Sequence, residues 1–238
     1  MRDQDANSLV NVKSVAATVR DGVGRPSSGA WGSDVDHLRW LRAAGVTSLS
    51  GRRLLDLGCG SGILCATALR DGASTVLGID LHPPAVEAAD AAQASQGRLR
   101  FLAADLNAAT WARDLTQALG WVPMDLIFLF DLLEHVDAPA LLLRNCAELL
   151  APQGQLVVTT PNCNSWERLL RPQTWSGAMD PQHKVIFTPW SLEFLAVRSG
   201  FSTDVLRAPI RKLEFLPSAL QPNIGAQIFA VFKKLHGA

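Results

Sequence analysis

Between residues 53 and 160, short apolar runs alternate with segments whose apolar residues recur at helical spacing. This alternation indicates βαβ units, in which a buried parallel sheet is connected by helices. The segments predicted as strands are 53–57, 75–79, 99–103, 126–130, 155–160, 201–206 and 224–232. The segments predicted as helices are 34–44, 64–70, 84–94, 140–150 and 189–199. The pattern therefore predicts the α/β fold class, with a seven-stranded, mostly parallel sheet.

The chain has 238 residues, which suits a single α/β domain. We expect an N-terminal helical arm at 1–50 and a core at 51–161, followed by an insertion at 162–187 and closing elements at 188–238. The insertion carries Trp166 and Trp175 among turn-forming residues. Long segments of this kind within a compact domain are usually functional, so we interpret it as a substrate cap. Ordinary surface variation is the alternative.

Composition excludes several classes of function. Lys and Arg total 22 and so do Asp and Glu, and this balance disfavours binding to bulk nucleic acid. The chain has no Tyr, which removes phenol chemistry, and none of its four Cys forms a C-x-x-C pair. Neither a signal peptide nor a transmembrane segment is evident, so we expect a cytoplasmic protein with reduced thiols.

The segment 54–69 contains three glycines at alternate positions directly between a predicted strand and a predicted helix. These are Gly58, Gly60 and Gly62, preceded by Asp56. Glycines allow a sharp turn and the close approach of a ligand, and the free N–H groups of a helix start favour anionic groups. Asp80 ends the next predicted strand, where a carboxylate can accept hydrogen bonds from both hydroxyls of a ribose.

The spacing of these glycines argues against a dinucleotide. The dinucleotide pattern G-x-G-x-x-G needs a third glycine at the position that Ile63 occupies. The carboxylate of Asp56 suits an ammonium group better than a pyrophosphate. An amino-acid head group together with a ribose predicts S-adenosylmethionine as the cofactor, and a nicotinamide-dependent dehydrogenase is the weakest alternative.

The motifs LLDLGCGSG, GID, AADL, DLIFLFDLLEHV and GQLVVTTPN occur in this order between about residues 52 and 200. In this order they resemble the motifs of class I S-adenosylmethionine-dependent methyltransferases. The resemblance implies a Rossmann-like, doubly wound sheet and a cofactor site at the carboxyl ends of its strands. The cofactor-binding residues that it implies are Asp56, Gly58, Cys59, Gly60, Asp80, Leu81, Asp105, Leu106 and Phe130.

The family also implies what these residues do. Asp56 is expected to orient the methionine ammonium, and Gly58 and Gly60 to pass under the methionine chain and the ribose. Asp80 is expected to hold the ribose hydroxyls while Leu81 packs on the adenine. The resemblance assigns the adenine amino group to Asp105, and a ring contact to the backbone N–H of Leu106. Phe130 either contacts the methionine part or is a core residue.

A second group of polar residues follows the predicted strand 126–130. Asp131, Glu134 and His135 have spacings of three and four, which predicts that they share one face of a helical turn. His183 stands near the end of the insertion. This set resembles that of ubiquinone-pathway O-methyltransferases. It also resembles that of small-RNA 3′-end 2′-O-methyltransferases, and the latter group uses it to hold Mg²⁺.

The resemblance implies Asp131, Glu134, His135 and His183 as ligands of Mg²⁺, with Mn²⁺ or Zn²⁺ as alternatives. Asp131 replaces a Glu of those groups and is one methylene shorter, which weakens the case for its direct ligation. Without a metal, His135 or His183 is a candidate catalytic base, or the Glu-His pair is structural only.

We interpret the sequence as that of an O-methyltransferase for a small phenolic, quinol-like or other hydroxyl-bearing molecule, acting as a monomer or homodimer. Three alternatives stay open. One is methylation of an RNA 3′-terminal 2′-hydroxyl, and another is N- or C-methylation of a small natural product. The third is a protein that binds the cofactor without turnover.

Overall fold

The computed structural model describes residues 41, 46, 48–82, 95–120, 122–175, 177, 180–210 and 222–235. Most of the predicted N-terminal arm lies outside the described residues, as does the helix predicted at 84–94. Of the helix predicted at 34–44, only Leu41 is described, and it is helical and buried.

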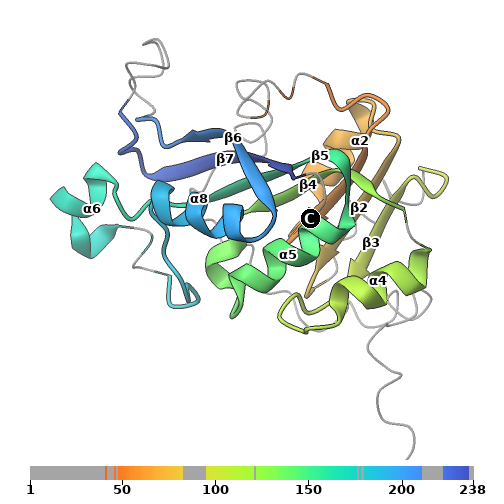
Figure 1. Cartoon of the computed structure of the whole chain (residues 1–238), viewed down its shortest axis with the longest axis horizontal. Coiled ribbons are helices and arrows are strands. Elements are labelled where there is room, and N and C mark those ends of the chain that lie inside the picture. The colour runs from red at the N-terminus through yellow and green to blue at the C-terminus, as the bar shows by residue number, and fades with distance from the viewer. Residues whose placement is uncertain are drawn as a thin grey trace, which may run out of the picture.

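Seven strands form one sheet in the order β3-β2-β1-β4-β5-β7-β6, which confirms the predicted fold class (Figure 1). The strands β1 to β5 pair in parallel, whereas β7 is antiparallel to both β5 and β6. Their bounds are β1 Arg53–Leu57, β2 Thr75–Asp80, β3 Leu99–Ala103, β4 Met124–Phe130, β5 Leu150–Pro161, β6 Phe201–Arg207 and β7 Gln227–Lys234. The parallel order places the carboxyl ends of β1, β2, β3 and β4 along one edge of the sheet.

Helices cover both faces of this sheet. The α-helices are α2 Ile63–Arg70, α4 Trp111–Leu119, α5 Pro139–Leu149, α6 Trp166–Leu170 and α8 Pro189–Arg198. The 3₁₀ turns are η2 Leu133–His135 and η3 Pro172–Thr174. In Figure 1, α4, α5 and α8 lie in front of the sheet and α2 lies behind it. The sheet is therefore doubly wound.

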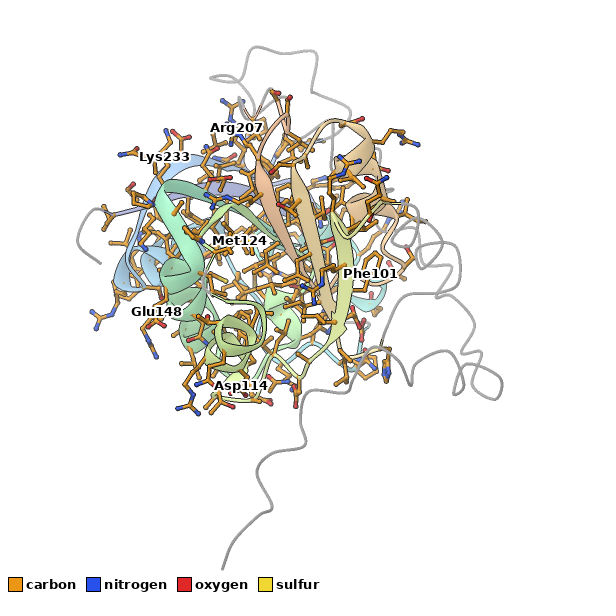
Figure 2. All side chains as sticks on the ribbon, turned by 90° about the vertical axis from the view of Figure 1, so that its right-hand side faces the viewer. Phe101, Asp114, Met124, Glu148, Arg207 and Lys233 are labelled. Carbon is orange, nitrogen blue, oxygen red and sulfur yellow. The ribbon has the colours of Figure 1, made fainter. Side chains whose placement is uncertain are left out.

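Side-chain alternation along the strands builds two cores. In β1, Leu55 and Leu57 pack in a cluster with the buried residues of α4, α5 and α8. Leu54 points the other way and joins a cluster with the buried residues of α2. Figure 2 shows side chains on both faces of the sheet. Phe101 on β3 and Lys233 on β7 lie toward opposite edges of the sheet. Strands buried on both faces are typical of parallel sheets between helices.

Two local predictions need correction. The nine-residue helix α4 was not predicted, although apolar residues recur at helical spacing along it, and Trp111, Ala112 and Leu115 join the core cluster. Strand β5 begins at Leu150 and not at residue 155, and its pairing with β4 shifts register there. Gln153 has φ of +67° within this irregular stretch, between Pro152 and Gly154.

The insertion 162–187 leaves and rejoins the sheet at one place. Asn162 and Phe187 form a parallel β-bridge, and the Cys163 N–H donates to the Phe187 carbonyl at 2.7 Å. Between these points lie α6 and η3. The side chain of Ser165 caps α6 by accepting from the Arg168 N–H. The two ends of the insertion are therefore tied to each other beside the carboxyl end of β5.

Candidate functional site

The glycine loop joins β1 to α2 in a left-handed conformation. The φ angles are +74° at Gly58 and +50° at Gly60, which residues with a side chain rarely adopt. The N–H groups of Gly58 and Cys59 both donate to the Ile79 carbonyl, at 2.7 and 3.1 Å. A methyl group added at Gly58 would lie 3.0 Å from Leu132 Cδ1, whereas one at Gly60 would meet no atom within 4 Å. Open space therefore lies beside Gly60.

Asp80 holds this loop at the end of β2. One of its carboxylate oxygens accepts from the Gly60 N–H at 2.9 Å, and the other accepts from the His82 N–H at 3.0 Å. A carboxylate oxygen has two acceptor positions, so each oxygen keeps capacity for a further donor. Leu81 is 60% exposed beside it. The structure thus presents a fixed anion and an apolar side chain next to the open space.

Asp56 is buried in β1, with only 3% of its surface exposed. Its carboxylate accepts from the Cys65 thiol at 3.2 Å. The hydrogen bond with Cys59 raises the pKa of Cys65 most, and burial is the next largest cause. This thiol is therefore neutral. Cys59 lies in the glycine loop and Cys65 lies on α2, and both are buried. These thiols pack and donate; they are not exposed nucleophiles.

The remaining predicted cofactor residues lie at the ends of β3 and β4. Asp105 follows β3, is exposed, and accepts from the Asn107 N–H at 2.9 Å. Leu106 is half-buried and packs against the larger core cluster. Phe130 ends β4, half-buried, with its ring stacked on Phe128 at a centroid distance of 5.0 Å. Both interpretations of Phe130 fit this position.

Glu134, His135 and His183 come together although 48 positions separate the two histidines. One ligand atom from each of the three lies within 4.8 Å of the others. The imidazole rings of the histidines have centroids 4.7 Å apart. We call these three residues the Glu-His-His cluster.

Glu134 is the buried member of the Glu-His-His cluster, at 1% exposure. Thr160 donates to its Oε2 at 2.9 Å, whereas its Oε1 has no hydrogen-bond partner in the described part of the chain. Burial raises the pKa of Glu134 to about 8, and the nearby negative charge of Asp131 adds to the rise. A buried carboxylate with an unpartnered oxygen is costly unless a cation or a proton joins it.

The backbone fixes the two histidines of the cluster. His135 Nδ1 lies 3.3 Å from the Gln182 carbonyl, and His183 Nδ1 lies 3.0 Å from the Gly177 carbonyl. A carbonyl only accepts, so each contact requires a proton on Nδ1 and leaves Nε2 as the nitrogen with a lone pair. Histidines that bind metals are commonly oriented by such contacts.

The end of the insertion is attached directly to η2. The Glu134 carbonyl accepts from the N–H groups of Lys184 and Val185, at 2.7 and 3.2 Å. These two bonds explain how His183 reaches the sheet. They also make the geometry of the cluster depend on the position of the insertion.

Asp131 does not join the Glu-His-His cluster, contrary to the prediction of a shared helical face. Its φ is +48°, and only Leu133–His135 form a 3₁₀ turn, so the helical spacing does not apply. Its Oδ1 accepts from Thr159 Oγ1 at 3.1 Å and from Gln227 Nε2. Asp131 therefore links the end of β4 to β5 and β7.

Sequence reasoning missed Thr160 and Gln227. Thr160 is fully buried in β5, and a hydroxyl at the end of an otherwise apolar strand was the available signal. Gln227 has no comparable signal, because its contact with Asp131 depends on the antiparallel entry of β7.

Within the described residues, no helix is long and apolar enough to cross a membrane.

A family model described as "Methyltransferase domain" matches residues 35–205. A ubiquinone biosynthesis O-methyltransferase of Neisseria meningitidis is 34% identical over 137 residues, 55% of this chain and 53% of that protein. One from Caulobacter sp. is 37% identical over 118 residues, 50% of this chain and 44% of that protein. The chain thus spans about half the length of the curated relatives it matches.

Solved structures agree on the fold. An S-adenosylmethionine dependent methyltransferase from Mesorhizobium loti aligns with a TM-score of 0.57 at 21% sequence identity. The alignment covers 85% of this chain and 99% of that one. At this identity the likeness concerns the architecture of the sheet and its helices.

Proposed function

Because the chain belongs to the methyltransferase domain family, with a class I S-adenosylmethionine-dependent methyltransferase fold, we propose that it methylates a hydroxyl group of a small aromatic molecule. One observation carries this proposal: the glycine loop and the Glu-His-His cluster are neighbours at one edge of the sheet. Leu132, which precedes η2, lies against Gly58. A methyl donor over the loop is therefore next to an acceptor at the cluster.

S-adenosylmethionine is the donor, and the residues at the strand ends bind it. The open space beside Gly60 accepts the ribose and methionine chain, and the free acceptor capacity of Asp80 takes the two ribose hydroxyls. Exposed Leu81 covers one adenine face, and Asp105 accepts from the adenine amino group. Asp56 supplies negative charge toward the methionine ammonium, directly or through water.

The acceptor is a hydroxyl on an apolar ring. Trp175 is 4% exposed and packs against Gly177, whose carbonyl holds His183, so an indole lies close to the cluster. The names of the two curated relatives, O-methyltransferases of ubiquinone biosynthesis, support a phenolic acceptor. Methyl transfer needs the acceptor oxygen in line with the sulfonium methyl, and the insertion is suited to hold it there.

The Glu-His-His cluster fits a divalent metal ion. Glu134 Oε1 is buried without a partner among the described residues, and the Nδ1 contacts of both imidazoles leave Nε2 as the candidate ligand atom. Asp180 Oδ2 lies 3.8 Å from His183 Nε2, which adds a second carboxylate beside the cluster. Two nitrogen ligands and one carboxylate suit Mn²⁺ or Zn²⁺ better than Mg²⁺, which prefers oxygen. A bound ion supplies positive charge that lowers the pKa of an acceptor hydroxyl. Because His183 belongs to the insertion, its ligation would join the metal site to the insertion.

A screen of small phenols, catechols and quinols, read out as S-adenosylhomocysteine formation, tests the proposal. We expect turnover with at least one acceptor, and loss of that turnover in Asp80→Ala. Chelation followed by addition of Mn²⁺, Zn²⁺ or Mg²⁺ then distinguishes histidines that bind a metal ion from a histidine that acts as a general base. Full activity after chelation, with no metal found by elemental analysis, assigns His135 or His183 as a general base instead.

A further inference from the structure

Helix α8 presents a row of apolar side chains to solvent. Trp190 is 73% exposed, the largest fraction among the large apolar side chains that the structure describes, with Phe194 at 54% and Val197 at 50%. Their spacing puts them on one side of the helix. The other side, with Leu192 and Ala196, is buried in the core. This exposed side is not needed for folding the sheet.

The aromatic part of this side forms an ordered ladder. The rings of Trp190 and Phe194 stack with centroids 5.9 Å apart and an interplanar angle of 23°. The guanidinium carbon of Arg198 lies 5.7 Å from the Phe194 centroid. The three side chains are already held against one another, which reduces the entropy lost when the ladder is covered. Trp and Arg are also the residues most enriched at binding hot spots.

We propose that the α8 ladder binds a second copy of this chain, with the two helices antiparallel about a twofold axis at Phe194. A helix rises 1.5 Å per residue, so Trp190 and Arg198 lie about 6 Å on either side of Phe194. A twofold axis exchanges these positions, which places Trp190 of one copy opposite Arg198 of the other. The two Phe194 rings meet on the axis.

The charge distribution of the ladder favours a second copy over another partner. One end is an indole and the other end is a guanidinium, and an arginine over an indole face is a favourable cation–π pair. The twofold arrangement forms that pair twice. A partner helix without an aromatic side chain opposite Arg198 does not form this pair. This proposal is independent of the proposed methyltransferase activity, because the ladder is not part of the cofactor or acceptor site.

Sedimentation velocity of the full chain over a concentration series is the first test. We expect a monomer–dimer equilibrium whose dissociation constant rises more than tenfold in Trp190→Ser and in Phe194→Ser. Leu170→Ser on α6 is the matched control, since Leu170 is 71% exposed and lies outside the ladder. Circular dichroism checks that each variant is folded. A chain that is monomeric throughout, or a dimer unchanged by both ladder variants, overturns the proposal.

Cysteine cross-linking tests the twofold axis itself. In Phe194→Cys the two new thiols lie on the axis, so mild oxidation at high protein concentration traps the dimer as an intersubunit disulfide although loss of the ring weakens it. In Trp190→Cys they lie about 12 Å apart by the helix rise, beyond the roughly 7 Å limit between Cα atoms for a disulfide. We expect a covalent dimer from the first variant and none from the second or from Leu170→Cys. Equal cross-linking of Phe194→Cys and Trp190→Cys excludes the antiparallel arrangement.

Discussion

Substitution of Gly60 by alanine separates cofactor binding from folding. The added methyl group meets no protein atom within 4 Å, and the Gly60 N–H stays available to Asp80. The folding cost therefore comes from the backbone alone, where φ is +50°. A left-handed conformation costs an L-residue roughly 1–2 kcal/mol. Restriction of the unfolded chain by alanine offsets about 0.4–1 kcal/mol of that cost.

The net loss of stability is about 1 kcal/mol, which lowers the melting temperature of a chain this long by roughly 2–4 °C. The loss of cofactor affinity is separate, because the methyl group occupies the space proposed for S-adenosylmethionine. Overpacking costs about 1–3 kcal/mol, so the dissociation constant should rise by a factor of roughly 5 to 150. Isothermal titration calorimetry with S-adenosylmethionine measures this change.

Gly51→Ala is the matched control for this measurement. Gly51 precedes β1, has φ of +73°, and a methyl group there also meets no atom within 4 Å. The control should lose similar stability while keeping its affinity for the cofactor. If Gly60→Ala binds S-adenosylmethionine as tightly as the wild type, the cofactor does not lie against Gly60 and the reasoning fails. Equal loss of affinity in both variants attributes the effect to folding.

Three further predictions concern the two sites. Asp80→Ala removes the proposed acceptor of the ribose hydroxyls, and hydrogen bonds to a charged group contribute about 1.5–3 kcal/mol each, so calorimetry should show at least tenfold weaker S-adenosylmethionine binding. In the metal-free protein, the pKa of Glu134 is raised from its ordinary value of 4.5 to about 8, so the folded state keeps this proton after the unfolded chain has lost it. The free energy of unfolding therefore falls by about 1.4 kcal/mol per pH unit as the pH rises through that window. Glu134→Gln should abolish this fall in urea titrations at several pH values, and an unchanged slope would falsify the raised pKa. His183→Ala should lower Mn²⁺ affinity while sparing S-adenosylmethionine affinity, and equal loss of both in calorimetry would contradict separate sites.

The strands of the sheet could be predicted because they carry a strong local signal. Strands β1 and β3 have the predicted bounds, since their apolar runs are flanked by polar or turn-forming residues. Helix α4 was missed although its sequence carries a signal, since apolar residues at 111, 112, 115, 118 and 119 recur at helical spacing.

The candidate site was only partly predictable for a different reason. The glycines lie where β1 passes into α2, and Asp80 ends β2, so sequence order alone places them. The position of Asp131 depends on a left-handed residue, which spacing does not reveal. The meeting of His183 with Glu134 depends on backbone bonds from Lys184 to η2. Such bonds form between distant segments and leave no periodic pattern in the sequence.

The tied ends of the insertion have a consequence for diversification. Backbone bonds hold both ends of the insertion, at 162–166 and at 183–187, so the chain between these ends behaves as a loop on a constant base. Doubling the length of a flexible loop costs only about 0.6 kcal/mol of closure entropy. Segments of other lengths can be exchanged here without rebuilding the sheet. If the insertion selects the acceptor, a library confined to this loop explores new acceptors while the methyl donor site is inherited intact.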